Sequence, residues 1–416
     1  MEAIPVRRSV PGSVHIEPTD ASATDDPGSV PDLVAQLHDE IARDGPITFA
    51  RFMEVALYDP THGYYRSEAE RPGRGGDFLT APETHPIFGQ AIARQIEQLW
   101  ELLKRPQPFA LLEYGAGSGA LAEAVLRELE RPDGPMAGVA VYAAAEINRH
   151  RRAALDARLA AADLGRQADA HPAVGCVIAN EFLDALPVHR VQSIGGRLQE
   201  LFVDQAGTGA GQGFADRPGA PSTPALAARL AGEGVVLAEG QQAEVCLGLD
   251  AWFEDLARRL ERGYAIVIDY GRPGPELYSA GRFGGTVMGY VRHRAIEYLY
   301  RNIGRQDLTA HVDFTAVELA AKRHGFESLG LTTQAEFLIG AGAEELLERV
   351  RSDPRTDLAA WVELRSAVVR MLDPRAMGGF RVLMLARNAP ASPLPRGLVR
   401  QTPASPSETG ATTARP

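Results

Sequence analysis

Residues 109–130 read FALLEYGAGSGALAEAVLRELE, and this stretch decides the class of fold. An apolar run is followed by three glycines in five residues and then by a helical pattern over 120–130. Short apolar runs of this kind are typical of buried parallel strands. Glycines after a strand let the backbone approach a ligand and leave N–H groups of the next helix free to bind it. The stretch therefore predicts a strand, a ligand-binding turn and a helix.

The alternation of strands and helices continues toward the C-terminus. Three more apolar runs predict buried parallel strands: VAVYAAAE (139–146), GCVIANEF (175–182) and YAIVIDYG (264–271). Helical patterns over 149–162 and 250–263 separate them. Strand and helix in alternation predict an α/β fold built on a doubly wound parallel sheet.

The end of the predicted sheet contains two more strands. They are expected at FESLGLTTQ (326–334) and GFRVLMLAR (379–387), with a helical insertion between them at 335–375. Just upstream, Thr315 and Glu318 have the spacing of a capping box and predict the start of another helix.

The chain before the first strand is helical. Apolar periods predict helices at 31–45, at 48–59 with Thr48 as N-cap, and at 83–105. Two polar stretches, 57–65 and 75–89, come before the last of these helices. A loop this polar can be a lid over a ligand, or a turn whose Asp and Thr side chains cap the helix. The sequence leaves both interpretations open.

The remaining segments define the domain layout. Alternation on both sides of Gly195-Gly196 predicts a hairpin over 188–204, and the low-complexity stretch 206–224 predicts a mobile surface loop. The layout expected is a disordered tail (1–30), a helical N-terminal region with an active-site lid (31–107), a core (108–388) with insertions at 188–249 and 335–375, and a second disordered tail (389–416).

Composition excludes several classes of protein. The 416 residues contain 43 Lys and Arg and 54 Asp and Glu, a net charge of −11, which argues against binding of nucleic acid by the whole chain. Because no uncharged apolar run reaches about 18 residues, we expect a soluble protein without membrane insertion. Cys176 and Cys246 are far apart and in no metal-ligand spacing, so we expect a reducing compartment.

The glycine turn (Gly115, Gly117 and Gly119) is the sharpest chemical signal. With Ala120 it also fits the G-x-G-x-x-A pattern of dinucleotide folds, so the glycines alone do not choose between nicotinamide and S-adenosylmethionine cofactors. Glu113, two residues before the first glycine, favours S-adenosylmethionine, because an acid there suits a cationic methionine end better than a pyrophosphate.

Glu146 closes the second predicted strand. An acidic side chain at this position can accept both hydroxyls of a ribose, which supports nucleoside binding without naming the ligand. Alternatively, Glu146 binds no ligand and is only a charged residue at the solvated N-terminus of the following helix.

The segment ANEFLDALPVHR (179–190) follows the fourth strand, at the edge of the sheet where ligands bind. It contains Asn180, Glu181 and Asp184 within five residues. Two carboxylates beside a sulfonium can hold a guanidinium or ammonium substrate and accept a proton. Alternatively, either carboxylate only caps the next helix.

Two downstream segments, 286–293 and 304–315, contain His and Asp residues. They lack an HxxxH or paired-Cys spacing, so we expect no metal site and interpret these groups as satisfied core or interface polar residues.

Taken together, the motifs resemble one family, the MidA-like S-adenosylmethionine-dependent methyltransferases. The motifs occur in family order over about residues 45–388: DP..GYY, GDF.T.PE, E.G.GSG.L, NEF.DALP, DYG, T...Y..H, DLTAHVDF, TQ..FL and MG.FRVL. The resemblance implies a class I methyltransferase core, a Rossmann-like seven-stranded sheet whose last strand is antiparallel, with helical additions. It also implies S-adenosyl-L-methionine as cofactor and, from mitochondrial relatives that assist assembly of respiratory complex I, symmetric dimethylation of an arginine on a complex I subunit.

The resemblance assigns roles residue by residue. The cofactor-binding residues it implies, together with those expected from position, are Glu113, Gly115, Gly117, Gly119, Glu146, Asn180, Asp77 and Thr80. Where the family has Ser, Leu-Arg and Gln after the second strand, this chain has Asn148, Arg151-Arg152 and Leu155. The third strand should fall at about 163–174, which is short and poor in apolar residues, so no adenine contacts are named.

The sequence therefore predicts in-line transfer of a methyl group to a nitrogen, with a protein arginine as acceptor and Glu181 and Asp184 as catalytic residues. Two other functions stay open: a cofactor-binding assembly module without turnover, and a methyltransferase with a small-molecule acceptor. A nicotinamide oxidoreductase is disfavoured by Glu113. We expect a cytoplasmic, bacterial protein, in which the hairpin 188–204 and the insertion 335–375 are candidate partner surfaces; a homodimer is one option.

Overall fold

The computed structural model describes residues 28–67, 80–164, 173–207, 213–292 and 294–399. Its centre is a six-stranded sheet in the order β15-β16-β9-β4-β2-β3. The bounds are β2 (Phe109–Tyr114), β3 (Ala140–Ala145), β4 (Ala173–Asn180), β9 (Leu260–Asp269), β15 (Glu327–Thr333) and β16 (Arg381–Arg387). Strands β2, β3, β4 and β9 pair in parallel, as the apolar runs predict.

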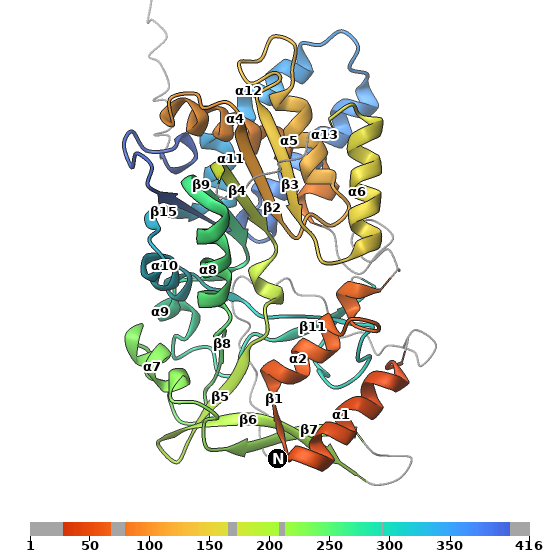
Figure 1. The fold of residues 1–416 in the computed structure, drawn as a ribbon, viewed down its shortest axis with the longest axis vertical. Coiled ribbons are helices and arrows are strands. Elements are labelled where there is room, and N and C mark those ends of the chain that lie inside the picture. Colours follow the sequence, from red (N-terminus) through yellow and green to blue (C-terminus); the bar gives the residue numbers. More distant parts are fainter. Residues whose placement is uncertain (1–27, 68–79, 165–172, 208–212, 293, 400–416) are drawn as a thin grey trace, which may run out of the picture.

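Helices cover both faces of this sheet (Figure 1). One face packs against α4 (Ile87–Leu102), α5 (Ala120–Leu129), α6 (Arg149–Ala161), α11 (Gln334–Gly340), α12 (Ala343–Arg351) and α13 (Leu358–Leu372). The other face packs against α8 (Leu249–Arg259) and α10 (Phe314–Arg323). The strands alternate between the two cores: Leu111 and Ile178 face the first, Leu112 and Val177 the second. The doubly wound sheet is therefore confirmed.

The expectation of seven strands is not confirmed: the described residues place six strands in this sheet. The parallel half ends at β3, and residues 165–172 of the stretch expected to hold a third strand lie outside the described residues. The last strand, β16, lies antiparallel between β9 and β15, as expected. Its side chains alternate between the two cores, with Val382 and Met384 in the first and Leu383 and Leu385 in the second.

A second layer combines the N-terminal region with the insertion. It contains β1 (Ile47–Thr48), β5 (His189–Ile194), β6 (Arg197–Ala206), β7 (Gly213–Gly219) and β8 (Gln242–Val245), in the order β1-β6-β5-β8 with β7 on β6. The predicted hairpin is β5–β6, which turns at Gly195-Gly196. Helices α1 (Pro31–Asp44) and α2 (Phe49–Tyr58) share an apolar core with this sheet, and they lie together at the lower end of Figure 1.

The predicted mobile loop at 206–224 is wrong in part. Residues 213–219 pair with residues 200–206 of β6, whereas 208–212 lie outside the described residues. Most side chains of β7 are exposed, so the strand has no apolar alternation that sequence reasoning can detect. Backbone hydrogen bonds hold it at the sheet edge, where Pro218 is tolerated.

The remaining connections complete the fold. Helix α7 (Ala225–Gly232) follows β7, and a three-stranded sheet contains β11 (Met288–Val291), β12 (Arg294–Ile296) and β13 (Asp307–Thr309). Two-residue strands β10 (Gly271–Arg272) and β14 (Val312–Asp313) pair beside the four-residue α9 (Gly274–Leu277). Among the described residues, no helix has both the length and the apolar character needed to cross a membrane.

Two local predictions require correction. The N-cap of α10 is Asp313, which accepts the N–H of Ala316, so the predicted capping box of Thr315 and Glu318 is absent. The hydroxyl of Thr315 instead accepts the N–H of Gly274. Residues 389–399, expected in the C-terminal tail, include a 3-10 turn at Arg396–Leu398 that packs on α11 and α4, with the N–H of Gly397 bonded to Gln95. The other parts of the two predicted tails, residues 1–27 and 400–416, lie outside the described residues.

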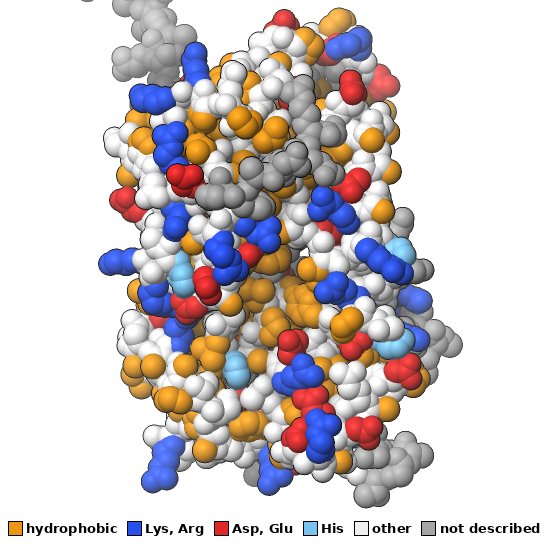
Figure 2. All heavy atoms as spheres, in the orientation of Figure 1, with side chains coloured by type: hydrophobic (Ala, Val, Ile, Leu, Met, Phe, Trp, Pro, Cys, Tyr) orange, Lys and Arg blue, Asp and Glu red, His pale blue; other side chains and the backbone are white. Residues whose placement is uncertain are grey.

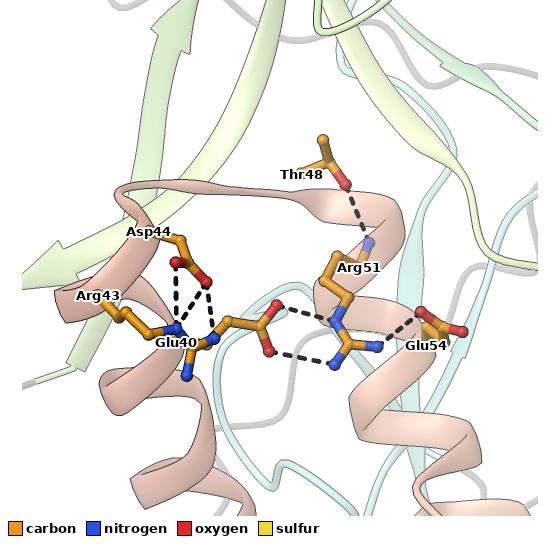
Figure 3. Close-up of polar contacts among 6 residues, drawn as sticks. All are labelled: Glu40, Arg43, Asp44, Thr48, Arg51 and Glu54. Atoms are coloured by element: carbon orange, nitrogen blue, oxygen red, sulfur yellow. Dashed lines mark hydrogen bonds and ion pairs between the residues drawn. The ribbon is translucent and has the colours of Figure 1, made fainter.

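The start of α2 is confirmed in detail (Figure 3). Thr48 Oγ1 accepts the N–H of Arg51 at 3.1 Å. The guanidinium of Arg51 forms two hydrogen bonds to Glu40 of α1, at 2.9 and 3.1 Å, and one to Glu54 at 2.9 Å. These contacts fix the angle between α1 and α2, and α2 provides one wall of the site described below.

We expect Thr48→Val to lower the free energy of unfolding by about 1 kcal/mol, because the variant loses the N-cap acceptor at nearly constant volume. Thr48→Ser keeps the acceptor and is the matched control. Urea unfolding of both variants checks this prediction, which is wrong if the two variants have the same midpoint.

Candidate functional site

A cavity of about 430 Å³ lies at the carboxyl ends of β2, β3 and β4. It is within the size range of small-molecule sites. Its other walls come from α2, the 3-10 turn η1 (Tyr64–Arg66) and the short helix α3 (Ala81–Thr84). Five glutamates and two arginines line it: Glu54, Glu83, Glu113, Glu146, Glu181, Arg66 and Arg151. The lining is therefore acidic and favours a cationic ligand.

The face drawn in Figure 2 is hollowed between the two layers of the molecule, and hydrophobic side chains line the hollow. Around it, basic and acidic side chains are interspersed on this face.

The glycine turn forms the floor of the cavity. Gly115, Gly117 and Gly119 have φ values of 68°, 52° and 78°, in the left-handed region that favours glycine. A Cβ on Gly119 would lie 2.5 Å from Leu155 Cδ1, and one on Gly115 would lie 3.1 Å from the ring of Phe182. Backbone conformation at all three positions, and close packing at Gly115 and Gly119, therefore favour glycine in this turn.

Glu146 is joined to this turn. Its Oε2 accepts the N–H of Gly117 at 3.0 Å, and its Oε1 accepts the N–H of Asn148 at 2.8 Å. The N-cap of α6 is Asn148, which accepts the N–H groups of His150 and Arg151. Glu146 therefore lines the cavity and is not the cap of that helix.

Glu113 is 3% exposed and faces the cavity beside Gly115. Its Oε2 accepts the hydroxyl of Tyr142 at 2.6 Å. Burial raises the pKa of Glu113 to about 7, because a carboxylate loses hydration in this site. A cation bound nearby would favour its ionised form.

Glu181 and Asn180 also line the cavity, from the end of β4. Glu181 has a φ of 48°, an uncommon value for a residue with a side chain, and its N–H donates to Ile268 O at 2.8 Å. Burial and the neighbouring Asp184 raise the pKa of Glu181 to about 8. Asn180 Oδ1 is buried and has no hydrogen-bond partner among the described residues. Two polar groups in this segment are thus available to a ligand.

Asp184 is close to Glu181 but does not line the cavity. Its carboxylate accepts the hydroxyl of Tyr270, on the far side of the segment, and burial raises its pKa to about 6. The structure therefore separates the two predicted catalytic carboxylates: Glu181 faces the cavity and Asp184 lies behind it.

The segment 80–84 borders the cavity above the glycine turn. Thr80 lines the cavity, and Glu83 accepts the hydroxyl of Ser118, which joins α3 to the turn. Thr80 is the N-cap residue of α3, but its side chain makes no capping hydrogen bond. Asp77 lies outside the described residues. Asp59, in the first polar stretch, accepts the N–H groups of Thr61 and His62 and closes a turn.

The stretch 57–65, predicted as either a lid or a capping turn, provides an aromatic wall of the cavity that the sequence did not specify. Tyr58 and Tyr65 stack with ring centroids 5.6 Å apart. The hydroxyl of Tyr58 donates to Ala185 O at 2.8 Å, and that of Tyr65 donates to Asp307 Oδ1 at 2.7 Å. Tyr65 is in the motif LYDPTHGYY, but its neighbour Tyr64 is fully buried in the core, and the motif alone does not tell them apart.

Asp269 was also missed as part of the site. It ends β9, is fully buried, and accepts backbone N–H groups of the segment that follows Glu181. The available signal was the DYG motif, which ends a strand with an acid, as Glu113 nearly ends β2.

The downstream polar residues make structural contacts. Asp313 caps α10, and Thr286 bonds to Glu244 through its N–H and its hydroxyl. Within the described parts of the chain, no group of three or more His, Cys, Asp and Glu residues is placed to hold a metal ion.

The chain is similar to known methyltransferases in both sequence and structure. The model of the family described as "Putative S-adenosyl-L-methionine-dependent methyltransferase" matches residues 91–332. The chain is 31% identical over 377 residues to "Protein arginine methyltransferase NDUFAF7 homolog, mitochondrial" of Drosophila melanogaster, covering 83% of this chain and 82% of the relative. The human "Protein arginine methyltransferase NDUFAF7, mitochondrial" is 27% identical over 376 residues, covering 83% of this chain and 81% of the relative.

A solved structure has the same fold. A Burkholderia thailandensis protein bound to S-adenosyl-homocysteine is 36% identical, covers 86% of this chain and 92% of its own, and superposes with a TM-score of 0.75.

Proposed function

Since this chain belongs to the MidA-like family of S-adenosyl-L-methionine-dependent methyltransferases, we propose that it methylates an arginine side chain of a protein. The observation that carries this proposal is the position of Glu181, a partly buried carboxylate in the cavity that also contains the glycine turn. The names of the NDUFAF7 relatives support arginine as the acceptor.

The residues around the turn fit the cofactor. The glycine backbone leaves space for the ligand, Glu146 offers its carboxylate to a ribose, and Asn180 has a free acceptor oxygen. Glu113 lies where a carboxylate can pair with the ammonium of a methionine end. When bound, S-adenosyl-L-methionine supplies an electrophilic methyl group on a sulfonium.

The other side of the cavity fits a guanidinium. A guanidinium is planar and cationic, stacks on aromatic rings, and pairs with carboxylates in its own plane. The stacked Tyr58 and Tyr65 offer the rings, and Glu181 offers the carboxylate. A lysine ammonium could also pair with the carboxylate, but it is not planar and would stack less favourably on the tyrosine rings.

Transfer to arginine requires loss of a proton, because the guanidinium is protonated at neutral pH. A nitrogen–carbon bond forms, the carbon–sulfur bond breaks, and the proton passes to a base. Glu181 is our candidate base, since its raised pKa lies close to neutrality, where general bases are most effective. Asp184 lies behind it, and its negative charge raises the pKa of Glu181.

The test is incubation of the purified protein with methyl-labelled S-adenosylmethionine and a lysate of its host lacking the gene. Mass spectrometry then identifies methylated arginine. We expect one labelled protein, and following the resemblance we propose a respiratory complex I subunit. Label on lysine alone, or on a small molecule, would contradict arginine as acceptor. Cofactor binding without any labelled product would favour a partner-holding module.

Cofactor affinity should depend on pH through Glu113. An ionised Glu113 attracts a cation, so affinity should rise as pH increases through about 7 and level off above it. Between pH 6 and pH 8 we expect Kd to fall about tenfold, because the ionised fraction of a carboxyl group with a pKa of about 7 rises about tenfold over this range. Calorimetry with S-adenosylmethionine measures it. Glu113→Gln controls for the ligand's own titration, and an unchanged pH dependence in this variant would contradict the role.

The cytoplasmic location expected from the sequence stays a prediction, and so does the homodimer.

A further inference from the structure

The segment that carries Glu181 into the cavity has an unusual backbone. Glu181 has a positive φ, and the next three residues turn away from β4 into a 3-10 helix (η2, Leu183–Ala185). Their N–H groups would be without partners in the core if nothing accepted them. The conformation of this segment therefore depends on an acceptor from elsewhere in the chain.

Asp269 provides this acceptor. A single carboxylate oxygen, Oδ2, accepts the N–H groups of Phe182, Leu183 and Asp184 at 3.1, 2.9 and 3.3 Å. The other oxygen, Oδ1, accepts the N–H of Tyr270 at 2.9 Å. The side chain is 0% exposed, so water does not compete for these bonds.

The next residue supports the same segment from the other side. The hydroxyl of Tyr270 donates to Asp184, whose own carbonyl accepts the N–H of Ala310 at 2.9 Å. The dipeptide 269–270 at the end of β9 thus holds both the backbone and the last side chain of the segment. Of the two carboxylates in this segment, only that of Glu181 lines the cavity.

We propose that Asp269 is a positioning residue for methyl transfer, which fixes the backbone after β4 so that the Glu181 carboxylate faces the acceptor nitrogen. This inference rests on the proposed role of Glu181. Asp269 itself does not line the cavity, and its hydrogen bonds to the segment are all to backbone N–H groups.

Asp269→Asn is the informative substitution. An asparagine has one acceptor oxygen and one NH₂ group, so at least one of the four N–H groups would face another donor. We expect the rate of methyl incorporation into host lysate protein to fall about 100-fold, as displacements near 1 Å do. Affinity for S-adenosyl-homocysteine should stay within about threefold, since the glycine turn is untouched.

A double-mutant cycle distinguishes positioning from a general structural role. If Asp269 acts through Glu181, then Asp269→Asn should lower the rate no further in a Glu181→Gln background. An equal loss in both backgrounds, or a rate within about threefold of wild type for Asp269→Asn alone, would overturn the proposal. Glu200→Gln is the matched control: Glu200 is equally buried and accepts the N–H of Ser222, but lies in the second layer.

Hydrogen exchange provides a readout that needs no acceptor. The amides of 182–184 should exchange faster in Asp269→Asn with S-adenosyl-homocysteine bound, and should be unchanged in Glu200→Gln. Unchanged exchange in Asp269→Asn would overturn the proposal. If the wild-type protein labels no lysate protein, the arginine acceptor fails, and exchange still decides whether Asp269 fixes the segment.

Discussion

Glu181→Gln is expected to lower the rate of methyl transfer by about 10³-fold, in the range that loss of a general base costs. Glutamine keeps the size of the side chain but cannot accept the proton that the guanidinium must lose. The cavity retains its shape, so binding of S-adenosyl-homocysteine should change little. Methyl incorporation at saturating cofactor and calorimetry with the product measure the two effects separately. A variant that keeps full turnover would exclude Glu181 as the base.

The same residue sets the expected pH dependence. Glu181 must be ionised to accept a proton, so the rate should rise with pH through about 8 on its acid limb. Buried Asp184 and Asp269 lie nearby, and Asp184 raises the pKa of Glu181 by like-charge repulsion. Asp184→Asn removes one of these charges and should shift the acid limb to lower pH. A limb that does not move would show that another group titrates.

Gly117→Val is the second change with a large expected effect. A Cβ at this position meets only Gly115 O, at 3.9 Å, so the new side chain would occupy the open space of the cavity. The φ of 52° adds strain of about 1–2 kcal/mol for a residue with a side chain. Together with lost ligand contacts, we expect affinity for S-adenosyl-homocysteine to fall by more than about 100-fold.

Gly196→Val is the matched control for this substitution. Gly196 also has a positive φ, of 70°, with open space around it, but it lies in the β5–β6 turn. The backbone strain in Gly196→Val should lower the stability of the protein without lowering its affinity for S-adenosyl-homocysteine. Equal loss of affinity in the two variants would mean that Gly117 acts through stability and not through contact with the cofactor.

The parts of the site that sequence reasoning predicted are local. Gly115, Gly117 and Gly119 follow a strand directly, and the class of fold places Glu146 at the end of the neighbouring strand. A few consecutive residues determine each of these positions. The parallel pairing of β2, β3, β4 and β9 follows from the same alternation, whereas the number of strands does not.

The parts that were missed depend on contacts between distant residues. Asp269 meets a segment 85 to 87 residues earlier in the chain, and Tyr65 bonds to Asp307 across 242 residues. No spacing in the sequence encodes such contacts. Asp184 shows the reverse error: it is close to Glu181 in sequence, but the turn at 183–185 directs its side chain away from the cavity.

The pairing of β1 with β6 also bears on the order in which the chain can fold during synthesis. Thr48 pairs with Phe202, so the N-terminal helices leave the ribosome on the order of 10 s before the strand that completes their sheet. Until β6 has been made, the apolar faces of α1 and α2 lack the strand against which they pack. Tyr58, on α2, is then not yet held at the cavity. The central sheet is completed later still, because its interior strands β9 and β16 both follow β6 in the chain. Both walls of the cavity should therefore become stable only after β16 has been made, near the end of synthesis.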